Sequence, residues 1–187
     1  MLISLLQKQT PLIDVRSPIE YKKGALPNSI NLPILLDDER EQVGKAYKKL
    51  GPGPATDLGF KLVSGDRKEK RVNNWLNFIS NNPSAQIYCA RGGQRSKIAQ
   101  TWIAERGVNI SKIDGGFKSL RNECLNIIDE ACIDEKKWIV IAGMTGTNKT
   151  GIITLLNNGI DLEGLANHRG SAFGGFETPQ PTPIDFE

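Results

Sequence analysis

The stretch CARGGQRS, which begins at Cys89, combines a thiol with two arginines, two glycines and a serine. The apolar residues before Cys89 predict a strand, and those further on predict a helix that begins near Gln94. A strand–turn–helix of this kind points several backbone N–H groups at one place, where they bind an anion and lower the pKa of a thiol. Arg91 and Arg95 add fixed positive charge to the same place.

We therefore expect the thiolate of Cys89 to act as a nucleophile beside a bound tetrahedral anion. The glycine pair allows the backbone angles of a wrapped loop. The alternative is a buried structural cysteine before a helix-capping turn, but such a cysteine gives the glycines and arginines no packing role. The predicted anion-binding loop consists of Arg91, Gly92, Gly93, Gln94, Arg95 and Ser96.

A second set of chemical residues lies in GMTGTNKT, residues 143–150, which follows the phosphate-loop pattern GxxxxGK[ST] with one departure. Asn148 stands where the pattern has its second glycine, and asparagine tolerates left-handed backbone angles better than other side chains do. Lys149 would contact terminal phosphates, and Thr150 would hold Mg²⁺ if an ion is bound. The alternative is a turn that binds no phosphate. The predicted phosphate-binding residues are Gly143, Thr145, Gly146, Thr147, Asn148, Lys149 and Thr150.

The elements that must position these residues alternate between strands and helices. The pattern predicts strands within residues 10–15, 29–33, 85–90, 109–114 and 136–143, and helices within residues 17–24, 37–50, 55–80, 94–107, 115–131 and 151–158. Such alternation predicts an α/β fold built on a doubly wound parallel sheet. We expect one domain over residues 1–133 and the incomplete N-terminal part of a P-loop domain over residues 134–187.

Composition narrows the class of protein further. A formal net charge of +3 and a pI of about 8.7 permit a nucleic-acid partner without requiring one. Three cysteines without framework spacing favour a reducing cytoplasm, and no apolar run reaches the length of a membrane span. We therefore expect a cytoplasmic protein with no membrane partner and no permanently bound metal.

Several motifs resemble known families. LIDVRSPIEYKKGALPNSINLP and DGGFKSL are similar to the opening and the final glycine pair of a rhodanese domain. The motifs YCARGGQRS, VGKAYKKLGPGPA and DLEGLANHRGSAFG resemble the tRNA 2-selenouridine synthase family, which joins a rhodanese domain to a P-loop domain. The resemblance covers essentially the whole chain.

This resemblance implies a reaction on tRNA, in which selenium replaces sulfur in wobble 2-thiouridine. It implies selenophosphate as donor, an S-geranyl intermediate made from geranyl diphosphate, and a selenophosphate-producing enzyme as a partner. Cys89 would be the nucleophile or selenium carrier, and the phosphate loop would hold the prenyl diphosphate. His168 and Arg169 would contact the substrate, although a satisfied surface role is equally open for His168.

Other readings remain open. The spacing from Cys89 through five residues to Arg95 and Ser96 is that of cysteine-dependent phosphatases, whereas rhodanese loops are usually one residue shorter. A persulfide-carrying sulfurtransferase and an inactive truncated relic are further alternatives. The basic run 66–71 is either a solvated helix face or a contact for the tRNA backbone. We expect Asp14 and Arg16 to form a structural pair, and Trp75, Trp102 and Trp138 to lie in the core.

Overall fold

The computed structural model describes residues 2–133, 135, 137–144, 146–170 and 173–186, and its contacts divide the chain into two compact units, Met1–Leu125 and Asn126–Glu187. The first unit contains a four-stranded sheet of order β2-β1-β3-β4 in which every strand is parallel to its neighbours. The strands are β1 (Leu12–Asp14), β2 (Ser29–Asn31), β3 (Gln86–Tyr88) and β4 (Ser111–Lys112). The predicted α/β fold with a parallel sheet is confirmed.

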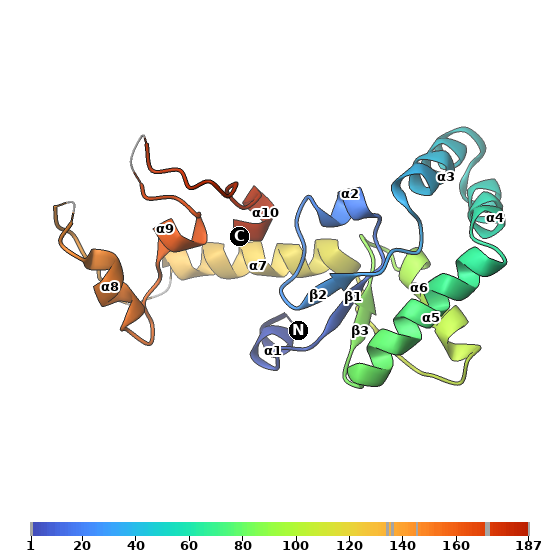
Figure 1. Ribbon diagram of the computed structural model, residues 1–187, viewed down its shortest axis with the longest axis horizontal. Helices are drawn as coiled ribbons and strands as arrows, with labels where there is room; N and C mark the ends of the chain where they lie inside the picture. The colour runs from blue at the N-terminus through green and yellow to red at the C-terminus, as the bar shows by residue number, and fades with distance from the viewer. Residues whose placement is uncertain (1, 134, 136, 145, 171–172, 187) are drawn as a thin grey trace. The chain divides into compact units, whose positions relative to one another are not determined.

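Alternating side chains of the strands face two different layers of helices, as the period of a strand requires. Ile13 and Ile87 pack in one cluster with Trp75 of α5 (Asp66–Asn81) and Ile103 of α6 (Gln94–Ala104). On the other face, the Tyr88 ring stacks on Phe117 of α7 (Gly116–Ile133) at 6.4 Å between centroids. Figure 1 shows α5 and α6 on one side of the sheet and the start of α7 on the other.

The first unit contains four further helices. They are α1 (Leu2–Gln7), α2 (Pro18–Tyr21), α3 (Asp37–Leu50) and α4 (Pro52–Leu62). The single helix predicted over residues 55–80 is wrong, because two helices cover this range. The chain leaves α4 at Val63 and enters α5 through Gly65, whose φ of +53° lies in the left-handed region that favours glycine.

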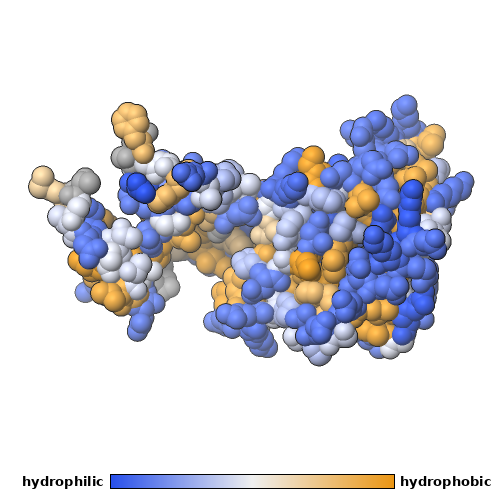
Figure 2. All heavy atoms as spheres, viewed as in Figure 1, coloured by the Kyte–Doolittle hydropathy of each residue, from blue (hydrophilic) through white to orange (hydrophobic). Residues whose placement is uncertain are grey.

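The second unit has α8 (Lys149–Thr154), α9 (Leu162–Leu165), α10 (Pro183–Phe186) and an antiparallel bridge between His168 and Gly175. The strand predicted over residues 136–143 is absent from the described part of this range, and Trp138 is 62% exposed rather than in the core. A parallel strand needs a hydrogen-bonding neighbour, and the described residues beyond 137 provide no strand to pair with it. Apolar side chains consequently gather on the surface around α8 (Figure 2).

None of the helices among the described residues is both long and apolar enough to cross a membrane.

Candidate active site in the cysteine loop

The predicted strand, turn and helix around Cys89 are all present. Strand β3 ends at Tyr88, and α6 begins at Gln94 with Gly93 as its N-cap. Gly92 and Gly93 have φ values of +63° and +83°, so the glycine pair adopts left-handed backbone conformations that other residues rarely adopt. The loop therefore places the first N–H groups of α6, which lack partners within the helix, beside the residue that follows the strand.

The thiol of Cys89 is almost completely buried, with 1% of the residue exposed. Its Sγ lies 3.4 Å from the carbonyl oxygen of Arg91, to which the S–H can donate. The hydroxyl of Ser96 lies 3.4 Å from Sγ and 3.2 Å from the carbonyl oxygen of Gly93. Because the hydroxyl carries one proton, it can turn from the carbonyl to the sulfur when the thiol ionises.

The start of α7 holds the cysteine loop from the other side of the sheet. The N–H of Phe117 donates to the carbonyl oxygen of Cys89 at 2.8 Å, and the N–H of Lys118 donates to that of Ala90 at 3.0 Å. Gly116 allows this approach, since a Cβ atom there would lie only 2.2 Å from the Cys89 carbonyl oxygen. The second glycine of the DGGF motif is therefore required by packing against the loop.

The two arginines of the loop occupy different environments. Arg91 is exposed, whereas the guanidinium of Arg95 makes two hydrogen bonds to Glu20 at 2.6 and 3.1 Å. Burial lowers the pKa of Arg95, but the hydrogen bond and charge of Glu20, together with the nearby Cys89 and Asp14, outweigh it and raise the pKa. Arg95 therefore stays a cation whose direction is set by Glu20.

Glu20 responds to the same pairing in the opposite direction. Burial alone would raise the pKa of its carboxyl, but the hydrogen bond and charge of Arg95, the Ser17 N–H and the charge of Arg40 together lower that pKa to about 2. The ionised Glu20 therefore stabilises the folded state fully above pH 4.5, the ordinary pKa, and this contribution is lost as the pH falls from about 4.5 to about 2.

Replacing Glu20 by glutamine is expected to destabilise the chain at neutral pH and to have a smaller effect in acid. Urea unfolding of both proteins at pH 7 and about pH 3 measures the difference in unfolding free energy. That difference should be smaller at about pH 3. Protonation of Glu20 in the parent chain removes the same negative charge that the substitution removes in the variant. A difference that stays constant or grows would show that the charge of Glu20 is not what stabilises this pair.

Lys112 is a loop neighbour that the sequence reasoning missed. A Cβ atom at Gly93 would lie 3.0 Å from the Nζ of Lys112, so the ammonium group packs directly against the loop backbone. Lys112 also forms a 2.6 Å ion pair with Asp114. Its position on β4, which pairs with β3, is the signal that could have identified it, since neighbouring parallel strands end at the same edge of the sheet.

Asp14 and Arg16 form the predicted structural pair. Two guanidinium nitrogens of Arg16 lie 2.8 and 2.6 Å from Oδ2 of Asp14, and both residues are buried. The same guanidinium lies 3.8 Å from the ring centroid of Phe117 and donates to the carbonyl oxygen of Gly24. Arg16 thus connects β1 with the start of α7, which itself holds the cysteine loop.

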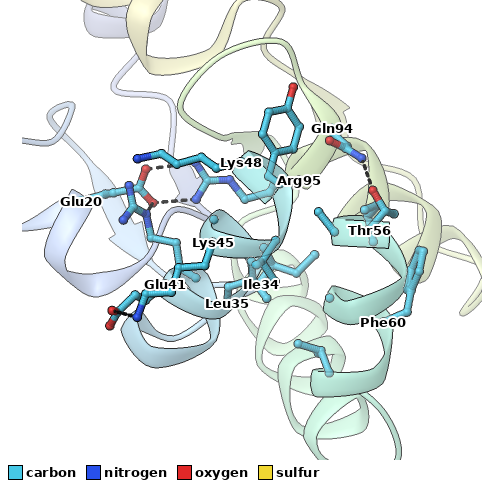
Figure 3. Close-up of a pocket in the computed structure, with 18 of the residues that line it drawn as sticks. Glu20, Ile34, Leu35, Glu41, Lys45, Lys48, Thr56, Phe60, Gln94 and Arg95 are labelled. Atoms are coloured by element: carbon cyan, nitrogen blue, oxygen red, sulfur yellow. Dashed lines mark hydrogen bonds and ion pairs between the residues drawn. The ribbon is translucent and has the colours of Figure 1, made fainter. Parts of the chain in front are cut away.

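Beside the cysteine loop lies a cavity of about 530 Å³ between α3, α4 and the start of α6 (Figure 3). Gln94 and Arg95 of the loop form part of its wall, and the Gln94 amide donates to the Thr56 hydroxyl of α4 at 2.9 Å. Its interior is apolar and includes Ile34, Leu35, Val63, Ile98, Phe60 and Trp102. Sequence reasoning did not find this cavity, because its walls come from helices that meet only in the folded chain.

The predicted phosphate loop forms a turn that ends in α8. Asn148 has φ +57° and ψ +33°, which is the left-handed conformation expected when asparagine replaces the second glycine. The Nζ of Lys149 donates to the carbonyl oxygens of Gly143 and Met144 at 2.8 and 2.9 Å, so the lysine folds back over its own loop. Thr145 lies outside the described residues.

The other residues of this loop contribute local contacts. The hydroxyl of Thr147 donates to the carbonyl oxygen of Met144 at 2.8 Å, and Gly146 has a φ of +86°. Thr150 belongs to the first turn of α8. No group of histidine, cysteine, aspartate and glutamate residues among those described has the arrangement of a metal site.

His168 and Arg169 lie in a turn of the second unit. The Nδ1 of His168 accepts a hydrogen bond from the Gly170 N–H at 3.0 Å, and the Arg169 guanidinium lies 4.7 Å from the ring centroid of Phe176. Both side chains are therefore engaged in local contacts, and their predicted role in substrate binding stays a prediction.

The other two cysteines and the basic run 66–71 lie on helices α7 and α5, outside the cysteine loop. Cys124 is a half-buried cysteine on α7, and Cys132 lies on the same helix. In the basic run, Arg71 pairs with Glu39 at 2.7 Å and Lys68 with Glu105 at 2.9 Å. These ion pairs neutralise part of the basic run, so fewer of its charges face solvent unpaired. A contact between this run and tRNA stays a prediction.

The parallel α/β unit with a buried cysteine in a strand–turn–helix loop is the arrangement of the rhodanese class, and comparison with known families agrees. The model of the rhodanese-like domain matches residues 2–123, and the chain belongs to this family. The model described as the tRNA 2-selenouridine synthase AAA domain matches residues 136–187. The predicted boundary at residue 134 between two domains stays a prediction.

Curated relatives carry one name. Proteins named tRNA 2-selenouridine synthase are 52% identical in Sulfurovum sp. (strain NBC37-1), 48% in Shewanella frigidimarina (strain NCIMB 400) and 46% in Pseudomonas syringae pv. syringae (strain B728a). Each match covers 98% of this chain and 50% of the relative, so the chain spans about half the length of these relatives.

A solved structure resembles the first unit. The N-terminal domain of a protein named for ATP/GTP binding, from Clostridium difficile 630, is 31% identical with a TM-score of 0.53. The match covers 62% of this chain and 89% of that one. The likeness supports the fold of the cysteine-loop unit.

Proposed function

We propose that this chain provides the selenium-transferring part of a tRNA 2-selenouridine synthase. The observation that carries the proposal is the cysteine loop, which combines a buried thiol, glycines in left-handed conformations and an arginine oriented by Glu20. Relatives of that name at 46–52% identity support the same assignment. The protein would act on 2-thiouridine at the wobble position of tRNA, in the cytoplasm, with selenophosphate as donor.

Different residues of the loop would bind selenophosphate and stabilise the attacking thiolate. The N–H groups at the start of α6 and the side chains of Arg91 and Arg95 would hold the phosphate oxygens of selenophosphate. Ser96 would stabilise the thiolate of Cys89, because its hydroxyl already lies within hydrogen-bonding distance of Sγ. Lys112 would add positive charge beside Gly93.

The chemistry follows from the cysteine acting as a nucleophile at phosphorus. The Cys89 thiolate attacks phosphorus, the phosphorus–selenium bond breaks, and hydrogen selenide anion leaves with the electron pair. The selenide then attacks C2 of S-geranyl-2-thiouridine, a carbon–selenium bond forms, and geranylthiolate leaves. Water hydrolyses the phosphocysteine and restores the thiol. No step changes an oxidation state, so the reaction needs no oxidant.

The phosphate loop would supply the geranylated base. In this proposal Gly143, Thr145, Gly146, Thr147 and Asn148 surround the diphosphate of geranyl diphosphate, Lys149 contacts its terminal phosphate, and Thr150 holds Mg²⁺ if the ion takes part. His168 and Arg169 would contact the tRNA or its base. A separate enzyme must produce the selenophosphate, since nothing in the cysteine loop makes it.

A cysteine-dependent phosphatase is the second candidate, and the five-residue spacing between Cys89 and Arg95 favours it. An alkoxide leaves phosphorus readily only when an acid protonates it, and the loop itself contains no carboxylic acid or histidine. Hydrogen selenide anion is a far weaker base and leaves without protonation. This difference favours selenophosphate over phosphate esters as the substrate.

Nucleoside mass spectrometry tests the proposed function. The chain is incubated with tRNA that contains 2-thiouridine, geranyl diphosphate and selenophosphate, and the digested tRNA is analysed for selenouridine. Selenouridine formation is the expected result. A folded protein that hydrolyses a phosphate ester and forms neither selenouridine nor geranylated base would instead favour the phosphatase.

A parallel reaction supplies tRNA that is already S-geranylated and omits geranyl diphosphate. It isolates the step assigned to the cysteine loop from the step assigned to the phosphate loop. We expect selenouridine and free geranylthiol in this reaction. Their absence, with selenophosphate still intact, would contradict the assignment of selenium transfer to Cys89.

A further inference from the structure

A second cavity, of about 500 Å³, lies between the segment that follows β2, the start of α3 and the first half of α5. This volume is in the ordinary size range of small-molecule sites. The residues of α5 that line it are spaced i, i+3, i+4 and i+7, which is one face of a helix: Arg67, Lys70, Arg71 and Asn74. Three of the four basic residues in the run 66–71 therefore line a cavity.

Hydrogen bonds hold the walls of this cavity in place. The guanidinium of Arg71 donates to both carboxylate oxygens of Glu39, at 2.9 and 2.7 Å, and also to the carbonyl oxygen of Ile34. The indole N–H of Trp75 donates to the carbonyl oxygen of Leu32 at 2.9 Å. Because Glu39 and Trp75 are buried, these contacts fix α5 against the start of α3 and the segment after β2. The cavity is therefore preformed.

The rim of this cavity carries polar groups that the fold does not use. The side chains of Lys70, Asn74 and Asp38 line the cavity and are exposed, and none of them bonds or pairs with a residue that the structure describes. Arg67 is exposed as well, and its guanidinium lies 3.8 Å from the buried carboxylate of Glu39. The rim therefore offers two cations, an amide and a carboxylate to a ligand.

We propose that this cavity binds one nucleotide of a single-stranded RNA. The phosphate would lie at Arg67 and Lys70, which are one turn apart on the same face of α5. The base would lie on Leu36, which is 46% exposed although it is apolar. The edge of the base would reach Asn74 and Asp38, which together can donate and accept hydrogen bonds.

The polar groups of the rim favour a nucleotide over an acidic peptide. The carboxylate of Asp38 would repel an aspartate or glutamate side chain, whereas it can accept from the amino or imino groups on the edge of a base. The amide of Asn74 donates and accepts in one plane, which also suits a base edge. Two cations beside these groups match the single phosphate of each nucleotide.

The cavity lies at the same edge of the sheet as the cysteine loop. Leu32 follows β2 directly and Cys89 follows β3 directly, with β1 between these strands. Two strand spacings amount to about 10 Å, so one RNA strand can reach both places. The inference rests on the proposed function in this respect: the RNA would be the tRNA whose base reacts at Cys89. The cavity would then hold a nucleotide that flanks the reacting one and would contribute to the choice of tRNA.

Two neighbouring asparagines of α5 give a matched pair of variants. Asn74 lines the cavity, whereas Asn73 is exposed on the same helix and lines neither cavity. Asn74→Glu would place a carboxylate one turn from Lys70, where it repels phosphate and pairs with the ammonium group. Asn73→Glu makes the same change of charge outside the cavity. Glutamate has a higher helix propensity than asparagine, so both variants should keep α5 intact.

The test is fluorescence anisotropy of a labelled single-stranded RNA hexamer without thiouridine, titrated with the 187-residue chain. We expect saturable binding that Asn74→Glu weakens about tenfold or more and Asn73→Glu changes by less than about twofold. Lys70→Ala should reduce the slope of log affinity against log salt by about 1, whereas Lys61→Ala, at an exposed lysine of α4, should not. Urea unfolding of each variant checks that the fold is intact.

Three outcomes would overturn the proposal. Equal weakening by Asn74→Glu and Asn73→Glu would show that RNA responds to the overall charge of α5 and not to the cavity. An aspartate-rich peptide that displaces the RNA at equal concentration would identify an acidic protein as the occupant. No binding by the folded parent chain would exclude a site for RNA. Because the hexamer has no thiouridine and the titration contains no selenophosphate, its failure is distinct from failure of the proposed function.

Discussion

Cys89→Ser is expected to abolish the conversion of S-geranylated tRNA to selenouridine, by a factor on the order of 10³ or more, and to leave any geranylation intact. A serine hydroxyl at this position stays protonated near neutral pH and is a poor nucleophile at phosphorus. Arg91, Arg95 and the start of α6 would still hold selenophosphate, so the donor should bind to the variant without being cleaved. Nucleoside mass spectrometry and phosphate release from selenophosphate measure the two effects.

Cys124→Ser provides the matched control, since Cys124 is a half-buried cysteine on α7 with no place in the loop. We expect the control to retain phosphate release and selenouridine formation. Equal loss of geranylation and selenation in Cys89→Ser would contradict the division of labour between the two loops. Phosphate release that survives in this variant would show that another group attacks selenophosphate.

Gly116→Ala is expected to lower the free energy of unfolding by about 3 kcal/mol or more. The φ of +59° at Gly116 is strained for alanine, and the new Cβ would lie 2.2 Å from the carbonyl oxygen of Cys89. Because both atoms in this contact are held by backbone, α7 must move away and the hydrogen bond from the Phe117 N–H must weaken. Urea unfolding measures the loss.

Gly107→Ala separates backbone strain from steric overlap. Gly107 has a φ of +76°, and a Cβ there would meet nothing within 4 Å. This variant should therefore lose only about 1–2 kcal/mol, the cost of a left-handed alanine. If both variants lose the same amount, contact with the cysteine loop is not what requires glycine at 116.

Most of the first unit could be predicted from the sequence, because its elements depend on local patterns. Short apolar runs such as LID and QIY give strands, and GGFKSLRNECL gives a helix entered through glycines. The strand expected at 136–143 has the same kind of pattern and does not form among the described residues. Strand formation depends on a pairing neighbour, which an apolar run does not supply by itself.

The candidate site could be predicted only in part from the sequence. The thiol, the glycine pair and the arginines are adjacent in the sequence, so the loop could be recognised from their spacing. The partners of that loop are distant in the sequence: Glu20 lies on α2, and Lys112 lies on β4. Only the order of strands in the sheet brings them to the same edge as Cys89.

The sequence by itself determined the chemistry of the loop and the class of fold, because residue spacing and periodicity act over a few turns of chain. The tertiary structure decided which groups surround the thiol, how Arg95 is oriented, and that an apolar cavity lies beside it. Those features require side chains from α2, α3, α4 and α6 to meet. Their meeting depends on the packing of helices on the sheet, and no local pattern contains that information.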